Sequence, residues 1–132
     1  MNQLQKLRQK VASLNILVVD DENAIREQSI KFMKKFCNNV DSAVDGEDAF
    51  NKVNTNSPYD LILSDIRMPK MNGLELSDKL QEKHKEIFIA LMTGSYELYD
   101  HTNANYDLYL EKPVNINNMT SMLEMLVIQK GL

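Results

Sequence analysis

The sequence lacks most of the features that would place a chain in a membrane, outside the cell or on nucleic acid. Its single cysteine, Cys37, cannot form a disulfide within the chain. No apolar stretch approaches the roughly 18 residues of a membrane span, and the first residues contain no secretory apolar core. The formal net charge is -4, and no basic cluster offers a surface for nucleic acid. We therefore expect a cytoplasmic protein without direct contacts to membrane or nucleic acid.

Length and composition predict one small domain. The chain has 132 residues, of which 43% are hydrophobic and 26% are charged, and both fractions are ordinary for a globular protein. This length supports a single buried core but not comfortably two. The sequence contains neither an internal repeat nor a low-complexity segment. The expected organisation is a helical extension over residues 1–14, followed by one domain over residues 15–130.

Short apolar runs alternate with segments of helical spacing along the chain. An uninterrupted apolar run, as at residues 15–19, is typical of a strand that is buried on both faces. The predicted strands cover residues 15–19, 39–44, 59–64, 87–92 and 106–110. The predicted helices cover residues 22–36, 46–53, 74–84, 95–105 and 116–127. This alternation predicts an α/β fold, with a doubly wound parallel sheet of five strands and right-handed crossovers through helices on both faces.

The segment of residues 95–105 carries the poorest helical signal of the five. It includes Tyr96, Asp100, His101 and Asn103, whose residue types prefer turns or strands to a helix. We therefore expect the helix in this segment to be short or frayed.

Charged side chains stand at the ends of three predicted strands. Asp20 and Asp21 follow the first strand, Asp65 follows the third, and Lys112 follows the fifth and precedes Pro113. Ligands of open parallel sheets bind beyond the carboxyl ends of the strands, so we expect these side chains to converge at one edge. Taken singly, each is an ordinary turn, cap or loop residue. Together, three carboxylates favour a hard-cation site, and a carboxylate beside a cation and a lysine can accept a phosphoryl group.

Five short motifs occur in order between about residue 15 and residue 128. They are residues 18–22 (VVDDE), 64–69 (SDIRMP), 72–74 (NGL), 92–94 (MTG) and 109–113 (YLEKP). This ordered set resembles the response-regulator receiver domain, the phosphoacceptor of two-component signalling, in its chemotaxis-regulator-like form. Any one motif alone is weak, whereas the ordered set is specific. The resemblance implies a flavodoxin-like sheet with strand order 2-1-3-4-5 and five helices, to which this chain adds a short amino-terminal helix.

The resemblance also implies the composition of the site. Asp65 would accept a phosphoryl group from a kinase phosphohistidine and form an acyl phosphate. Asp21 would bind Mg²⁺ directly together with Asp65, and Asp20 would bind it through water. The backbone carbonyl of Arg67 would complete the site, with Mn²⁺ as the alternative ion.

Further roles follow from the same resemblance. Lys112 would place a compact positive charge on the phosphoryl oxygens, and its peptide bond to Pro113 would be cis. The hydroxyl of Thr93 would bind a phosphoryl oxygen, while Tyr109 would turn inward as the switch aromatic. The remodelled surface would comprise the helix of residues 95–105, the strand after it and the last helix.

The expected partners follow from these roles. A sensor histidine kinase or a phosphotransfer protein would supply the phosphoryl group, and a downstream protein or an output domain would read the remodelled surface. Both a stand-alone regulator and a piece of a longer one fit the sequence.

The extension over residues 1–14 has a helical stripe of coiled-coil type. Leu4, Leu7, Val11 and Leu14 recur at spacings of three and four. Two heptads are too short to form a stable helix alone in water. The extension must therefore dock on the domain, pair with a second copy in a homodimer, or fray.

Two other function classes stand as alternatives to the receiver. An Mg²⁺-dependent aspartate-nucleophile phosphatase needs a second acid two residues after the nucleophile, where this chain has Arg67. A degenerate receiver would act only as a protein-interaction module. The residues that argue against it are Asp20, Asp21, Asp65, Thr93 and Lys112, all intact. We therefore expect a signalling domain that catalyses its own phosphorylation and dephosphorylation, and not an enzyme acting on other substrates.

Overall fold

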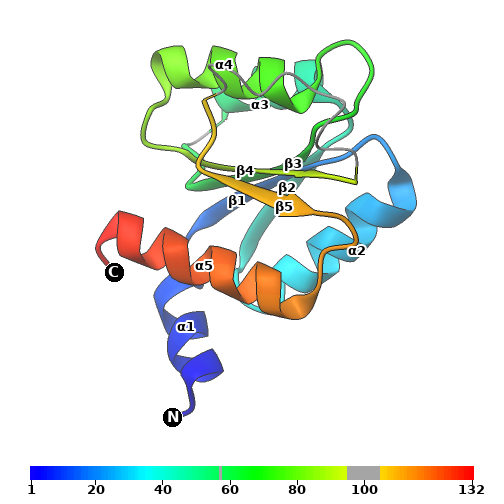
Figure 1. Ribbon diagram of the computed structural model, residues 1–132. Helices are drawn as coiled ribbons and strands as arrows, with labels where there is room; N and C mark the ends of the chain where they lie inside the picture. Colours follow the sequence, from blue (N-terminus) through cyan, green and yellow to red (C-terminus); the bar gives the residue numbers. More distant parts are fainter. Residues whose placement is uncertain (57, 95–104) are drawn as a thin grey trace.

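The computed structural model describes residues 1–56, 58–94 and 105–132, and its strands form one parallel sheet (Figure 1). In chain order the strands are β1 Asn15–Val19, β2 Asn39–Ala43, β3 Leu61–Asp65, β4 Phe88–Thr93 and β5 Leu108–Glu111. Their order across the sheet is β2-β1-β3-β4-β5. The structure therefore confirms the predicted five-stranded parallel sheet and its flavodoxin-like order.

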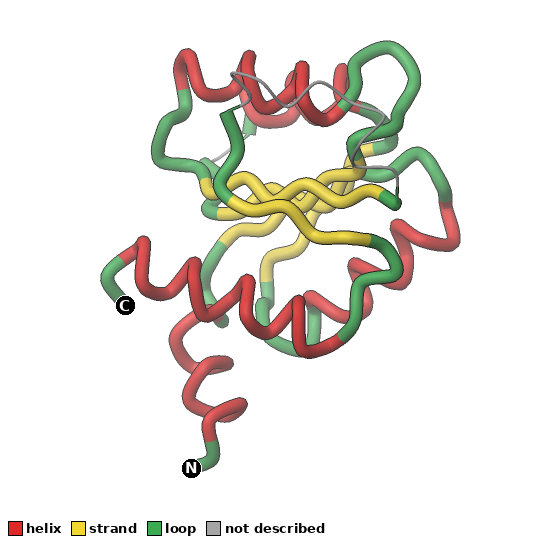
Figure 2. Tube along the Cα trace, in the orientation of Figure 1, coloured by secondary structure: helices red, strands yellow, loops and turns green. Residues whose placement is uncertain are grey.

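Helices cover both faces of this sheet. They are α1 Gln3–Val11, α2 Asn23–Met33, α3 Gly46–Thr55, α4 Gly73–Lys83 and α5 Ile116–Lys130. α3 and α4 form one layer and α2 and α5 the other, with the sheet between the two layers (Figure 2). The helix predicted over residues 95–105 lies outside the described residues except for its last position. Within the described part of the chain, no helix has the length and apolar character needed to cross a membrane.

The sheet divides the core into two clusters, because successive side chains of a strand point to opposite faces. Ile16 and Val18 of β1 pack with residues of α2 and α5, whereas Leu17 and Val19 pack with residues of α3 and α4. All residues of β3 and β4 are buried. This two-sided burial explains why the central strands appear in the sequence as uninterrupted apolar runs.

The amino-terminal helix α1 lies below α5 in Figure 1 and packs on the core cluster of the α2–α5 layer. Leu7 and Val11 are buried in the same cluster as Phe36, and the guanidinium carbon of Arg8 lies 5.9 Å from the centre of the Phe36 ring. Asn2 and Gln5 form a reciprocal capping box at the start of the helix. Of the three alternatives for the extension, the structure shows the docked one.

We expect Leu7→Ala to lower the free energy of unfolding by about 2–3 kcal/mol, because it leaves a cavity in the core beneath α1. Leu4, on the same helix, is 46% exposed. The control Leu4→Ala should therefore change stability by less than about 0.5 kcal/mol. Urea unfolding followed by circular dichroism measures both values, and equal losses would contradict the docked position of α1.

The thiol of Cys37 belongs to the same cluster and is 1% exposed. α1 and its carboxyl-terminal cap contact the residues on either side of it: Arg8 lies over Phe36, and the carbonyl of the cap residue Ala12 accepts the N–H of Asn38. Burial raises the pKa of the Cys37 thiol from 9.0 to about 12, and the negative charge of Asp60 adds to the rise.

This raised pKa predicts a loss of stability at alkaline pH. The unfolded thiol ionises near pH 9.0, whereas the folded thiol stays protonated up to about 12. The contribution of the buried Cys37 thiol to the free energy of unfolding is therefore fully present below pH 9. It is lost as the pH rises from 9.0 to about 12. Urea unfolding at several pH values under reducing conditions should show a steeper alkaline decline for the wild type than for Cys37→Ala. Parallel declines would contradict the buried, protonated thiol.

Candidate functional site

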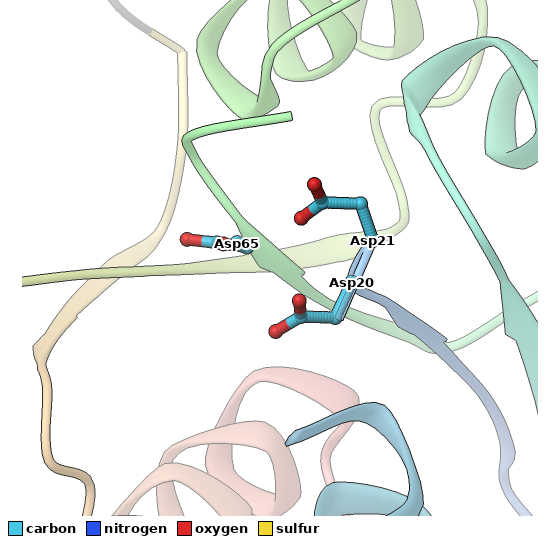
Figure 3. Close-up of side chains that lie close together, drawn as sticks. All are labelled: Asp20, Asp21 and Asp65. Atoms are coloured by element: carbon cyan, nitrogen blue, oxygen red, sulfur yellow. The ribbon is translucent and has the colours of Figure 1, made fainter. Parts of the chain in front are cut away.

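Three aspartates meet at the carboxyl ends of β1 and β3. Asp20 and Asp21 follow β1, and Asp65 is the last residue of β3. One carboxylate oxygen from each lies within 4.8 Å of the other two. Figure 3 shows the three side chains gathered at the strand ends, with their carboxyl groups directed to the same side. Asp20 and Asp65 are buried, whereas Asp21 is exposed, so the cluster opens to solvent through Asp21.

Lys112 brings a positive charge to the two buried aspartates. Its Nζ lies 3.3 Å from Oδ2 of Asp65 and 3.6 Å from Oδ2 of Asp20. The backbone N–H of Lys112 donates to the carbonyl of Thr93, which fixes the chain just after β5, and the Lys112–Pro113 peptide bond is cis. The lysine therefore reaches across the end of β4 from the strand beyond it.

The electrostatic balance at Asp65 is set mainly by burial. Burial raises the pKa of Asp65 above its usual value, and the nearby charge of Asp20 raises it further. Lys112 and a hydrogen bond from the backbone N–H of Arg67 act in the opposite direction. One ammonium is thus shared by two of the three clustered carboxylates, so an additional positive charge at the cluster would be favourable.

The donor set fits a small divalent cation. Within the described residues, Oδ2 of Asp20 is a buried side-chain oxygen that accepts no hydrogen bond. Such an atom normally has a partner. Hard oxygen ligands from one or two carboxylates, completed by water, are what Mg²⁺ prefers. Asp20, Asp21 and Asp65 could hold such an ion, and Arg67 lies in the loop that follows Asp65.

The two residues with expected switch roles are in contact with each other. Thr93 is the last residue of β4 and is buried. The hydroxyl of Tyr109, in the neighbouring strand β5, donates to the carbonyl of Thr93 at 3.0 Å. The surface residues expected between residues 95 and 104 lie outside the described part of the chain.

Several groups that support the site were not identified from the sequence. Arg26 of α2 donates from Nη1 to the carbonyl of Asp20 at 2.8 Å. Gly73, the first residue of α4, lies so close to Asp65 that an added Cβ would be 2.5 Å from its carbonyl oxygen. The motif around Asn72 and Gly73 was noted, but a glycine at a helix start gives no local sign of which backbone it approaches.

The geometry agrees with comparisons to known proteins. The family model of the response regulator receiver domain matches residues 16–124. The transcriptional regulatory protein DltR of Streptococcus agalactiae is 30% identical over 122 residues, which cover 90% of this chain and 54% of DltR. The DNA-binding transcriptional regulator NtrC of Proteus hauseri is 33% identical over 117 residues, which cover 83% of this chain and 24% of NtrC.

A solved structure has the same fold as this chain. The CheY-like response regulator receiver domain protein of Methanospirillum hungatei matches with a TM-score of 0.79 at 28% identity, covering 90% of this chain and 98% of that one. The chain spans about half of the length of DltR (54%) and about a quarter of the length of NtrC (24%). α1 precedes the residues that the family model matches.

We expect Mg²⁺ to stabilise the folded chain, because it would bind the clustered carboxylates of the folded state. At a hundredfold excess over the dissociation constant the gain in unfolding free energy would be about 2.7 kcal/mol. Asp21→Asn should remove most of this gain, and the control Glu82→Gln, an exposed acid on α4, should retain it. Urea unfolding with and without Mg²⁺ at constant ionic strength measures the effect. An equal Mg²⁺ response in both variants would place the ion elsewhere.

Proposed function

The chain belongs to the response regulator receiver domain family, and we propose that it accepts a phosphoryl group on Asp65 from the phosphohistidine of a sensor kinase or phosphotransfer protein. The observation that carries this proposal is the convergence of Asp65 with Lys112 and two further aspartates at one edge of the sheet. As a receiver domain of two-component signalling, it would act in the cytoplasm as a signalling domain and not as an enzyme on other substrates.

The proposed reaction moves one phosphoryl group. A carboxylate oxygen of Asp65 attacks phosphorus, the bond from phosphorus to the histidine nitrogen breaks, and the imidazole leaves and takes up a proton. The Lys112 ammonium, 3.3 Å from Oδ2 of Asp65, offsets the negative charge of the nucleophile and of the arriving phosphoryl oxygens. Asp65 is 5% exposed, and this burial strengthens its interaction with Lys112.

Mg²⁺ is the proposed cofactor, with Mn²⁺ as its substitute. Asp21 and Asp65 would ligate it directly, Asp20 would do so through water, and the backbone carbonyl of Arg67 would complete the protein's share. When bound, the ion supplies charge neutralisation to the phosphoryl oxygens. The buried Oδ2 of Asp20 supports this assignment, because in the described residues it accepts no hydrogen bond and has only the Lys112 ammonium nearby, at 3.6 Å.

The proposed output is a change at the strand next to the site. The hydroxyl of Thr93 would bind a phosphoryl oxygen, and Tyr109 would follow the movement of the end of β4. The bond from the Tyr109 hydroxyl to the Thr93 carbonyl supports this coupling, because it ties β5 to that end. Residues 95–105, β5 and α5 would then present a changed surface to a partner, to an output domain or to a second copy.

The longer relatives support a partner or an output domain. DltR and NtrC are named as transcriptional regulators, and this chain corresponds to 54% and 24% of their lengths. A receiver of this kind would pass its phosphorylation state to the remainder of a longer protein or to a separate protein.

Incubation with acetyl phosphate and Mg²⁺ should add one phosphoryl group per chain, detected as intact mass. EDTA should prevent the gain, because Lys112 alone then offsets the three carboxylates that the arriving anion meets. Asp65→Asn should abolish it, because an amide is not a competent nucleophile. Lys112→Gln keeps the nucleophile and should slow the reaction about tenfold or more.

Two outcomes would contradict this proposal. An adduct that persists in Asp65→Asn would move the acceptor to another residue. No adduct in the wild type, together with no binding of beryllofluoride, would leave a receiver that acts only through protein contacts.

A further inference from the structure

We propose that the amino end of α3, through Gly46, positions the loop after Asp65 and thereby sets the rate at which Asp65 is phosphorylated. The loop comprises residues 66–72, between β3 and the start of α4. This inference rests on the proposed function of Asp65. It assigns Gly46 as a positioning residue, which acts through the backbone of the loop and does not touch the phosphoryl group.

Gly46 and Met71 are in close backbone contact. A Cβ added at Gly46 would lie 2.3 Å from the carbonyl oxygen of Met71 and 2.9 Å from its Cβ. Real Cβ atoms essentially never lie within 3.0 Å of another heavy atom, so one of the two segments would have to move. Gly46 does not adopt a positive φ. The glycine is therefore required by space and not by backbone conformation.

A second contact holds the same two segments together. Asp45 caps α3 by accepting the N–H of Asp48 at 2.8 Å, and its other oxygen lies 3.8 Å from Nζ of Lys70. Lys70 has a φ of 67°, in the left-handed region that side chains rarely adopt. Such a conformation persists only where the surrounding contacts enforce it. The loop is thus held against α3 at two successive residues, Lys70 and Met71.

The loop is fixed to the nucleophile at its other end. The N–H of Gly73 donates to the carbonyl of Ile66 at 2.8 Å, which closes the loop next to Asp65. The N–H of Arg67 donates to the carboxylate of Asp65. Because the loop is closed, a displacement of the Met71 backbone cannot be absorbed locally. It therefore moves the backbone of Arg67, and this changes the orientation of the Asp65 carboxylate.

The size of the expected shift makes the effect measurable. Moving an added Cβ from 2.3 Å to ordinary contact distance requires a displacement of about 1 Å. A misplacement of about 1 Å at a reacting group can lower a rate about a hundredfold. We therefore expect Gly46→Ala to slow phosphorylation by acetyl phosphate about 10- to 100-fold.

The matched control is Val53→Ala on the same helix. Val53 is 4% exposed and packs in the α3–α4 cluster, so its truncation destabilises α3 without adding an atom next to the loop. At a temperature where all proteins are folded, Val53→Ala should phosphorylate within about twofold of the wild type. Amide chemical shifts of Arg67 and Gly73 should change in Gly46→Ala and stay in place in Val53→Ala.

Asp45→Asn provides a second variant in case Gly46→Ala does not fold. Asparagine keeps the helix cap but removes the charge that faces Lys70. We expect a loss of phosphorylation rate of about two- to fivefold with little change in thermal stability.

The outcomes separate this inference from the proposed function. If the wild type takes up no phosphoryl group, the phosphoacceptor role of Asp65 is overturned. The positioning role of Gly46 is then tested by the Mg²⁺ affinity of the variants. Gly46→Ala, or Asp45→Asn in its place, should weaken Mg²⁺ binding while Val53→Ala does not. The positioning role is overturned if the Gly46 and Asp45 variants keep the wild-type phosphorylation rate and Mg²⁺ affinity. It is also overturned if Val53→Ala loses as much phosphorylation rate and Mg²⁺ affinity as they do.

Discussion

Asp20 and Asp65 are buried carboxylates that share one ammonium, and the surrounding strands hold these three groups together. An unpaired buried charge is strongly destabilising, so both aspartates depend on the position of Lys112. The register of β1 and β3 brings the two aspartates together. Because Val19 lies opposite Ser64, Asp20 just after β1 lies beside Asp65 at the end of β3. β5 supplies the lysine from beyond β4. The order β1-β3-β4-β5 is the arrangement that makes this contact.

The two-sided core makes such a site tolerable in a small domain. β3 and β4 are buried along their whole length, so the strand ends that carry Asp65 and Thr93 are held by packing on both faces. Pre-organisation of this kind means that charges can approach without the protein rearranging. The same burial raises the pKa of Asp65. Burial of β3 and β4 therefore both holds the strand ends rigid and raises the pKa of the Asp65 carboxyl group.

Much of this arrangement could be predicted from the sequence, because it depends on local patterns. Uninterrupted apolar runs gave the central strands, and the carboxyl ends of parallel strands gave the convergence of Asp20, Asp65 and Lys112. The roles of these residues in phosphorylation are proposals. The contact of Gly46 with Met71 could not be predicted, because it joins a helix start and a loop whose local sequences are ordinary. The docking of α1 depends likewise on a partner surface far away in the sequence.

The position of Cys37 gives the chain a built-in reporter. Its thiol is the single one in the sequence, and α1 and its carboxyl-terminal cap contact the residues on both sides of it. Any opening that lifts α1 would present this thiol to a reagent in solution. The labelling rate then measures the fraction of time that the helix spends undocked, in the manner of native-state exchange. The stability of this helix could thus be followed at the amino end of the sheet without an introduced probe.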